Sequence, residues 1–250
     1  MDKKESLIDL FIHDLTGPLS IASTSIRSLL NKQDNYGQIT ERQKTTLNLV
    51  LRNVNKAQTF LGEMIEIYRS EEGLFKKELC SIRDILRESL LEAMEIIDPN
   101  LAEKLSYQDT YEGFCRLLAD NNVILEITGK YSVSPFCHDV KKIQQILRNL
   151  ITNALKYRRE TMKILISGDK DVVITVEDDG SGIPEDKRDH IFKRFSKLRD
   201  KNDNDNDIKG LGFGLSCVKA IVETMGGHIT VSSGHGAGAC FVVRIPPLQQ

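Results

Sequence analysis

The sequence has no tryptophan, no long apolar run and no paired cysteine motif. Its cysteines are odd in number and widely scattered, with no C-x-x-C spacing: Cys80, Cys115, Cys137, Cys217 and Cys240. This pattern argues against a disulfide framework and against a zinc site, and it indicates a reducing compartment. No apolar run approaches the roughly 20 residues that span a bilayer, and the first residues show no signal-peptide pattern. We therefore expect a cytoplasmic chain.

The sequence also lacks an excess of charge of either sign. Lysine and arginine number 34 against 36 aspartate and glutamate residues, for a formal net charge of -2. A nearly neutral chain has no overall attraction to nucleic acid or to an anionic membrane, so we expect no nucleic-acid partner. The 250 residues, 40% of them hydrophobic, suffice for one large domain or two modest ones, each with its own core.

The N-terminal part of the sequence has the apolar periodicity of two long amphipathic helices, at 3–30 and at about 40–69. Residues 31–40 read as a turn between them, and Pro18 should kink the first helix. A helical hairpin cannot cover both of its apolar faces by itself. We expect a two-fold dimer that closes a four-helix bundle; the alternative is that the hairpin packs on the rest of the chain.

From about residue 74 the pattern mixes helices and strands, which predicts an α+β fold overall. Ser81 is a candidate N-cap for the first helix of this part, with Asp84 three residues on. The expected helices cover 82–97, 101–121, 139–157, 191–198 and 213–225. The expected strands cover 123–128, 133–137, 164–167, 172–177, 229–232 and 240–245, and a polar loop covers 199–210.

Two glycine-rich segments stand about thirty residues apart, at 178–182 and 210–214. The first follows an expected strand and the second precedes an expected helix. Glycine lets a backbone approach a phosphate or a purine closely, and a helix N-terminus presents free N–H groups to anions. The second segment lacks both the Gly-Lys-Ser/Thr of a P-loop and the spacing of a dinucleotide fingerprint.

Two further polar groupings lie on expected helices. Asn149 and Asn153 are four residues apart and so share a helix face, with Lys156 beside them. That set suits a hydrated divalent ion and phosphates, although on its own it is more typical of an ordinary polar face. His13 lies opposite the apolar arc of the first helix and is followed directly by Asp14. A carboxylate can accept the proton that an imidazole nucleophile must lose.

Five motifs follow one another along the chain: His13-Asp14-Leu15-x-x-Pro18-Leu19, Asn149-Leu150-x-x-Asn153-Ala154-x-Lys156-Tyr157, Asp178-x-Gly180-x-Gly182, Ile191-Phe192-Lys193-Arg194-Phe195 and Gly210-x-Gly212-x-Gly214-Leu215. In this order they resemble the phosphoacceptor, asparagine, first glycine, phenylalanine and second glycine boxes of bacterial sensor histidine kinases of two-component systems. The resemblance covers nearly the whole chain. It implies a dimerisation and histidine phosphotransfer domain at 1–72, followed at 73–250 by an α/β sandwich that binds ATP, of a type shared with certain chaperones, topoisomerases and mismatch-repair ATPases.

The resemblance also implies a role for individual residues. His13 would be the phosphoacceptor, Asp14 its general base, and Lys197 a lid cation that neutralises charge as the γ-phosphate leaves. Asp178 would accept a hydrogen bond from the adenine amino group, and Asn153 would hold Mg²⁺. The ATP-binding set comprises Asn149, Asn153, Lys156, Tyr157, Asp178, Gly180, Gly182, Ile183, Phe195, Gly210, Leu211, Gly212, Phe213, Gly214 and Leu215.

The sequence thus predicts a dimeric, ATP-dependent histidine kinase that passes its phosphoryl group to an aspartate on a response-regulator receiver domain. One alternative is a catalytically silent scaffold that binds nucleotide, or nothing, and signals by conformation. A second is a plain ATPase of the same superfold, which would release phosphate without labelling itself. Because only twelve residues precede His13, the sensor would belong either to a longer receptor or to a separate protein.

One position departs from the resembling family. There, dephosphorylation of the regulator relies on a Thr or Asn four residues after the histidine, and this sequence has Gly17 at that position. Thr16 lies one residue early, about 100° round the helix. We therefore expect weak or absent phosphatase activity.

Overall fold

The computed structural model describes residues 3–31, 36–71, 75–188, 190–192, 214–234 and 236–248. The chain divides into two compact units, Met1–Tyr68 and Arg69–Gln250.

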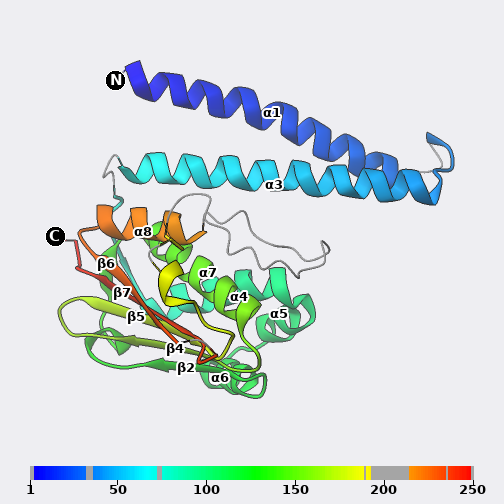
Figure 1. Cartoon of the computed structure of the whole chain (residues 1–250). Helices are drawn as coiled ribbons and strands as arrows, with labels where there is room; N and C mark the ends of the chain where they lie inside the picture. Colours follow the sequence, from blue (N-terminus) through cyan, green and yellow to red (C-terminus); the bar gives the residue numbers. More distant parts are fainter. Residues whose placement is uncertain are drawn as a thin grey trace. The chain divides into compact units, whose positions relative to one another are not determined.

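The first unit is a hairpin of two long helices, as the sequence predicts. Helix α1 (Lys3–Asn31) continues through Pro18, and helix α3 (Glu41–Glu71) runs beside it (Figure 1). Ser23 Oγ donates a hydrogen bond to Asn55 Oδ1 at 3.2 Å, so polar side chains join the two helices as well as apolar ones.

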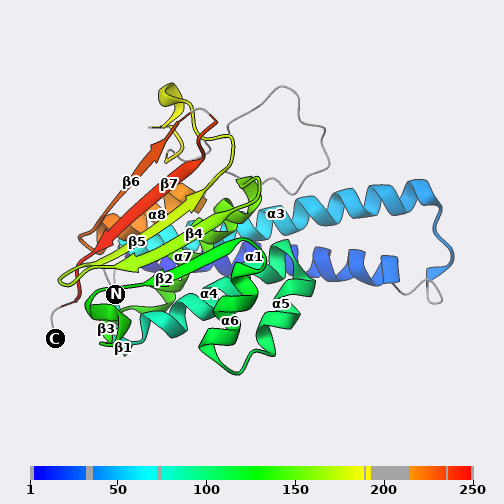
Figure 2. The same cartoon turned by 90° about the horizontal axis from the view of Figure 1, so that it is seen from below.

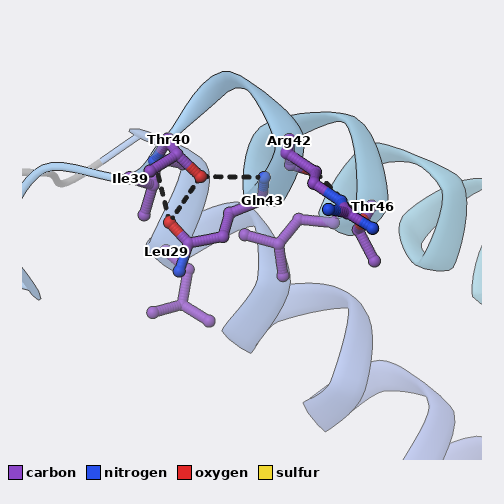
Figure 3. A pocket seen from close by; sticks show the side chains of 7 residues that line it. Leu29, Ile39, Thr40, Arg42, Gln43 and Thr46 are labelled. Carbon is purple, nitrogen blue, oxygen red and sulfur yellow. Dashed lines mark hydrogen bonds between the residues drawn. The ribbon is translucent and has the colours of Figure 1, made fainter.

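Helix α3 begins at a reciprocal capping arrangement, shown in Figure 3. Thr40 Oγ1 accepts the backbone N–H of Gln43 at 3.2 Å, and Gln43 Oε1 accepts the backbone N–H of Thr40 at 2.8 Å. These two bonds pair backbone N–H groups that have no acceptor within the first turn of an uncapped helix. The same turn borders an apolar depression between the helices, lined by Leu29, Ile39, Thr40, Arg42, Gln43, Thr46 and Leu47.

The hairpin buries only part of its apolar surface within one chain. Ile26 and Ser23 are buried, whereas Leu15, Ile21, Leu49 and Val50 are exposed, and Ile21 keeps 69% of its surface. The hairpin therefore leaves several large apolar side chains exposed.

The second unit is built on a five-stranded sheet in the order β2-β4-β5-β7-β6 (Figure 2). Strand β2 (Val123–Ile127) pairs parallel with β4 (Met162–Ser167), and the other pairs are antiparallel. The remaining strands are β5 (Val172–Asp178), β7 (Ala239–Ile245) and β6 (His228–Ser233). On β4 and β5 alternate residues are fully buried, which is the pattern of a sheet with one covered face.

Helices cover that face of the sheet (Figure 1). Helix α7 (Val140–Tyr157) contacts β5, α8 (Gly214–Thr224) contacts β6 and β7, and α4 (Ile82–Ile97) packs along α7. The expected α+β fold, with N-terminal helices followed by a helix-covered sheet, is confirmed. Ser81 caps α4 as predicted, because its side chain accepts the Asp84 N–H at 3.3 Å.

The structure corrects two details of the sequence reading. The helical stretch predicted at 101–121 is two helices, α5 (Pro99–Ser106) and α6 (Tyr111–Ala119), each opened by its own side-chain cap, from Asp98 and Thr110. The strand predicted at 133–137 is instead the shorter β3 (Phe136–His138), preceded by a 3-10 turn at Lys130–Ser132. Pro135 has no N–H to give a sheet, so regular pairing starts after it. Strand β3 pairs with β1 (Glu78–Cys80), which the sequence reading missed.

None of the five cysteines forms a disulfide in the structure. Among the described helices, none combines the length and the apolar character that a membrane crossing needs. The predicted helix at 191–198 and loop at 199–210 fall almost entirely outside the described residues; only Ile191 and Phe192 are described, in a turn.

Candidate functional site

Helix α7 carries the two asparagines of the candidate site. Asp139 caps its start by accepting the Lys142 N–H at 3.2 Å. One face of the helix is a continuous apolar stripe in the core: Ile143, Ile146, Leu147, Leu150, Ile151, Ala154 and Leu155. Asn149 and Asn153 flank that stripe and are only partly buried, as two amides on the rim of a packed helix should be.

Strand β5 ends at Asp178, whose side chain is 7% exposed. Its Oδ1 accepts the Gly180 N–H at 2.9 Å. Burial raises the pKa of Asp178, and the backbone N–H groups of Gly180 and Ala239 oppose that rise. A buried carboxylate with two fixed backbone donors is held in one orientation and keeps acceptor capacity for a further donor.

The segment after Asp178 lies directly against the end of α7. A Cβ added at Gly180 would be 2.2 Å from the Tyr157 carbonyl oxygen and 2.8 Å from Asp178 Oδ1, so no side chain fits there. Lys156 Nζ lies 5.4 Å from the centre of the Tyr157 ring, and that ring is 58% exposed. The first glycine box and the end of the asparagine box, far apart in sequence, are therefore neighbours in space.

Asp179 has a separate task from Asp178. Its carboxylate accepts the backbone N–H groups of Arg159 at 2.8 Å, Glu160 at 3.1 Å and Thr161 at 3.0 Å. Partial burial raises the pKa of Asp179, but these backbone donors outweigh it and hold the pKa below its usual value. The sequence reading gave Asp179 no role.

A third glycine-rich turn, at 234–238, supports the first one. Gly236 N–H donates to Ser181 O at 2.8 Å, and Gly238 N–H donates to Gly180 O at 3.1 Å. Gly238 has a φ of +76°, and a Cβ there would be 1.8 Å from the Asp178 carbonyl oxygen. The sequence reading missed this turn, although its alternating glycines at 234, 236 and 238 were a visible signal.

The start of α8 lies beside the asparagine helix. A Cβ added at Gly214 would be 3.2 Å from Asn149 Oδ1, so the second glycine box ends next to the first asparagine of the asparagine box. Leu215 follows on the first turn, partly buried, and Ile183 of the first glycine-box loop is buried. A helix N-terminus beside amide side chains is an arrangement that suits anionic ligands.

Several predicted site residues lie outside the described part of the structure: Phe195, Lys197, Gly210, Leu211, Gly212 and Phe213. The backbone of His13 belongs to α1, but its side chain is also outside that part, whereas Asp14 is described and exposed. The described residues show two contacts between motifs: Gly180 lies against Asp178 and Tyr157, and Gly214 lies beside Asn149.

The candidate metal ligands of the site are the amide oxygens of Asn149 and Asn153. Among the described residues, no group of three or more His, Cys, Asp or Glu side chains gathers to hold a metal ion. Amide oxygens such as those of Asn149 and Asn153 are hard ligands, and Mg²⁺ is commonly held by few protein groups with phosphates and water completing the shell. The amide oxygens of Asn149 and Asn153 therefore fit a Mg²⁺ ion whose shell phosphates and water complete.

Comparison with known proteins identifies the class of the second unit. Residues 138–249 match the family model of the Histidine kinase-, DNA gyrase B-, and HSP90-like ATPase, and this segment includes α7, both described glycine turns and α8. The second unit therefore contains a segment similar to the ATPase domains of this family.

Relatives along nearly the whole chain narrow that class. The chain is 28% identical over 250 residues to the adaptive-response sensory kinase SasA of Crocosphaera subtropica, covering 97% of this chain and 59% of that protein. It is 27% identical over 242 residues to the circadian input-output histidine kinase CikA of Synechococcus elongatus, covering 94% of this chain and 29% of that protein. The chain thus spans only part of the length of either curated relative, and both relatives are sensory or histidine kinases.

Solved structures share the fold. Full-length ShkA, in complex with AMPPNP, superposes with a TM-score of 0.64 at 20% identity, over 98% of this chain and 46% of that one. The Acinetobacter baumannii histidine kinase AdeS superposes with a TM-score of 0.55 at 22% identity, over 95% of this chain and 98% of that one.

Proposed function

We propose that this chain is an ATP-dependent protein histidine kinase that phosphorylates His13 and then transfers the phosphoryl group to an aspartate on a response-regulator receiver domain. The proposal is supported by two contacts inside the segment that matches the ATPase family model: Gly180 of the first glycine box lies against Tyr157, and Gly214 of the second lies beside Asn149. The same chain carries His13-Asp14 on a long helix of a separate unit.

Phosphorylation of His13 needs ATP as its only other reactant. An imidazole nitrogen forms a bond to the γ-phosphorus while the bond from that phosphorus to the bridging oxygen breaks, and ADP leaves. Asp14, the next residue and an exposed one, accepts the proton from the other ring nitrogen. Phosphoryl transfer depends mainly on positioning and charge stabilisation. In this proposal Lys197 is the lid cation that neutralises charge as the γ-phosphate leaves.

The pocket residues divide between the two ends of the nucleotide. Asp178, held by two backbone donors, accepts a hydrogen bond from the adenine amino group. Lys156 and Tyr157 contact the ribose or the phosphates, and the glycine boxes close over the triphosphate. Asn153, with Asn149 one turn earlier, holds Mg²⁺, which when bound neutralises phosphate charge.

The same proposal includes a homodimer. The exposed apolar residues of the hairpin, Leu15 and Ile21 on α1 and Leu49 and Val50 on α3, are left in water by one chain. A second copy that closes a four-helix bundle would cover them and would supply the isologous interface that most soluble homo-oligomers use.

Incubation with γ-labelled ATP and Mg²⁺ tests the enzymatic step. We expect acid-labile, base-stable incorporation of label, which is the signature of a phosphohistidine. His13→Gln should abolish labelling and leave ADP binding unchanged, because His13 belongs to the first unit and the residues assigned to ADP belong to the second. His228→Gln, at an exposed position on β6, is the matched control and should label as wild type does.

The outcomes separate the kinase from its rivals. Nucleotide binding without any labelling would favour a silent scaffold, and release of phosphate without self-labelling would favour a plain ATPase. Labelling that persists in His13→Gln would show that another residue is the acceptor. Asn153→Ala should remove most of the Mg²⁺ dependence of binding, as calorimetry with and without Mg²⁺ would show.

A further inference from the structure

The turn that joins α7 to β4 is held by one carboxylate. Asp179 Oδ1 accepts the N–H groups of Arg159 and Glu160, and Oδ2 accepts that of Thr161. Asp179 N–H in turn donates to Thr161 O at 3.3 Å. Hydrogen bonds to an ionised acceptor are about twice as strong as neutral ones, so three successive backbone donors on one carboxylate hold the whole turn.

The Asp179 hydrogen bonds connect two groups of residues to which the proposed function assigns one nucleotide: those at the end of α7 and those at the end of β5. On one side, α7 ends at Lys156 and Tyr157. On the other, Asp179 directly follows Asp178 at the end of β5. The Asp179 carboxylate is therefore the side chain that links the end of the asparagine box to the first glycine box.

The end of α7 and the first glycine box are in close contact, and further hydrogen bonds fix the turn that follows α7. Gly180 approaches the Tyr157 carbonyl too closely for any side chain. Arg158 Nη1 donates to the carbonyl oxygens of Asn121 and Asn122, each at 3.3 Å, which fixes the turn to the segment before β2. Asp178 itself is held by Gly180 and Ala239 and needs no bond from the Asp179 side chain.

We propose that Asp179 is a positioning residue that sets the distance between Asp178, at the adenine end of the site, and Lys156 with Tyr157, at the ribose and phosphate end. The inference rests on the proposed function, since it requires that these residues bind one nucleotide. Its consequence is selective: loss of the carboxylate releases the end of α7 but leaves Asp178 on its own backbone donors.

The test compares two ligands, ADP and adenosine, by calorimetric titration of the full chain. Asp179→Ala should weaken ADP binding about tenfold or more, because small displacements of positioned groups have effects of that order. Adenosine binding, which depends mainly on Asp178, should change much less. Asp179→Asn keeps one acceptor oxygen and should fall between the wild type and the alanine variant.

The matched control is Asp98→Ala. Like Asp179, Asp98 is an aspartate whose carboxylate accepts a backbone N–H, here a single one from Leu101 at 3.1 Å. It caps α5, which carries no residue of the candidate site. Urea unfolding of each variant shows how much stability it has lost. We expect Asp98→Ala to lose stability and keep the wild-type ratio of ADP to adenosine affinity, and Asp179→Ala to lose that ratio.

Two results would overturn the inference, and they are distinct. An unchanged affinity ratio in Asp179→Ala, or in Asp179→Asn should the alanine variant not fold, would make Asp179 a merely structural residue while leaving the proposed function intact. A wild-type chain that binds neither ligand would overturn the proposed function, and this inference with it.

Discussion

Acidification should destabilise the second unit through one buried histidine. His138 ends β3, is 0% exposed and stacks on Phe136 with ring centres 5.6 Å apart. Its Nδ1 accepts the Asp139 N–H at 2.9 Å, so in the neutral ring the proton is on Nε2. Within the described residues, that buried Nε2 has no hydrogen-bond partner. An added proton would place a charge in an apolar stack between Phe136 and the edge of Phe75.

The size of the effect follows from the pKa. Burial lowers the pKa of His138 from 6.5 to about 4, and the Asp139 carboxylate only partly opposes the shift. The unfolded chain takes up this proton near pH 6.5 and the folded chain only near pH 4. Stability is therefore unaffected above this window and falls as the pH drops through it, by at most about 3 kcal/mol at about 1.4 kcal/mol per pKa unit.

Urea unfolding from about pH 7.5 to about pH 4.5 measures this dependence. His138→Phe removes the titrating group and should flatten the fall relative to wild type, whatever stability it loses at neutral pH. His228→Gln, at an exposed position, should keep the wild-type dependence. Parallel curves for His138→Phe and wild type would refute the reasoning, because they would assign the acid sensitivity to other groups.

The remaining predictions concern the pocket and the hairpin. Asp178→Asn should weaken ATP binding about tenfold or more, as loss of a charged acceptor does, whereas Glu177→Gln at the exposed neighbour should not; wild-type calorimetry of the first variant would contradict the adenine assignment. Gly180→Ala should lower unfolding stability by about 1–3 kcal/mol through overpacking against the Tyr157 carbonyl, and an unchanged urea midpoint would argue against that close approach. Gly17→Thr should raise loss of label from a phosphorylated regulator in the presence of ADP, since a Cβ at Gly17 meets nothing within 4 Å; rapid loss already in wild type would show that Gly17 does not impair the phosphatase.

Much of the fold was readable from local patterns. The two long amphipathic stretches gave a hairpin, Ser81 capped its helix, and the alternating β-branched runs became β4 and β5. These features depend on neighbours three or four residues away or on simple alternation. The reading failed where such signals conflict: Pro135 shortened a strand, and the caps Asp98 and Thr110 divided one helical stretch into two.

The candidate site was only partly readable in the same way. The motif residues could be named because each motif is contiguous, and their order carried the resemblance to histidine kinases. Asp179 could not be assigned, because its three partners lie eighteen to twenty residues earlier. The glycines at 234, 236 and 238 were visible in the sequence. Their hydrogen bonds to Gly180 and Ser181 were not, because those residues lie more than fifty positions earlier.

The sequence by itself therefore determined which residues this protein has for nucleotide chemistry, and in which helices and strands they stand, because periodicity, caps and contiguous motifs are local properties. Only the tertiary structure decided how those residues are divided between tasks. The motif resemblance singled out Asp178 and left its neighbour Asp179 without a role; in the structure Asp178 is buried at a strand end and Asp179 holds a turn. His138, one of several unassigned histidines, is expected to be pH-sensitive because β3 places it in an apolar stack. Burial and hydrogen-bond partners come from segments distant in sequence, so they exist only once the sheet and its helices have packed together.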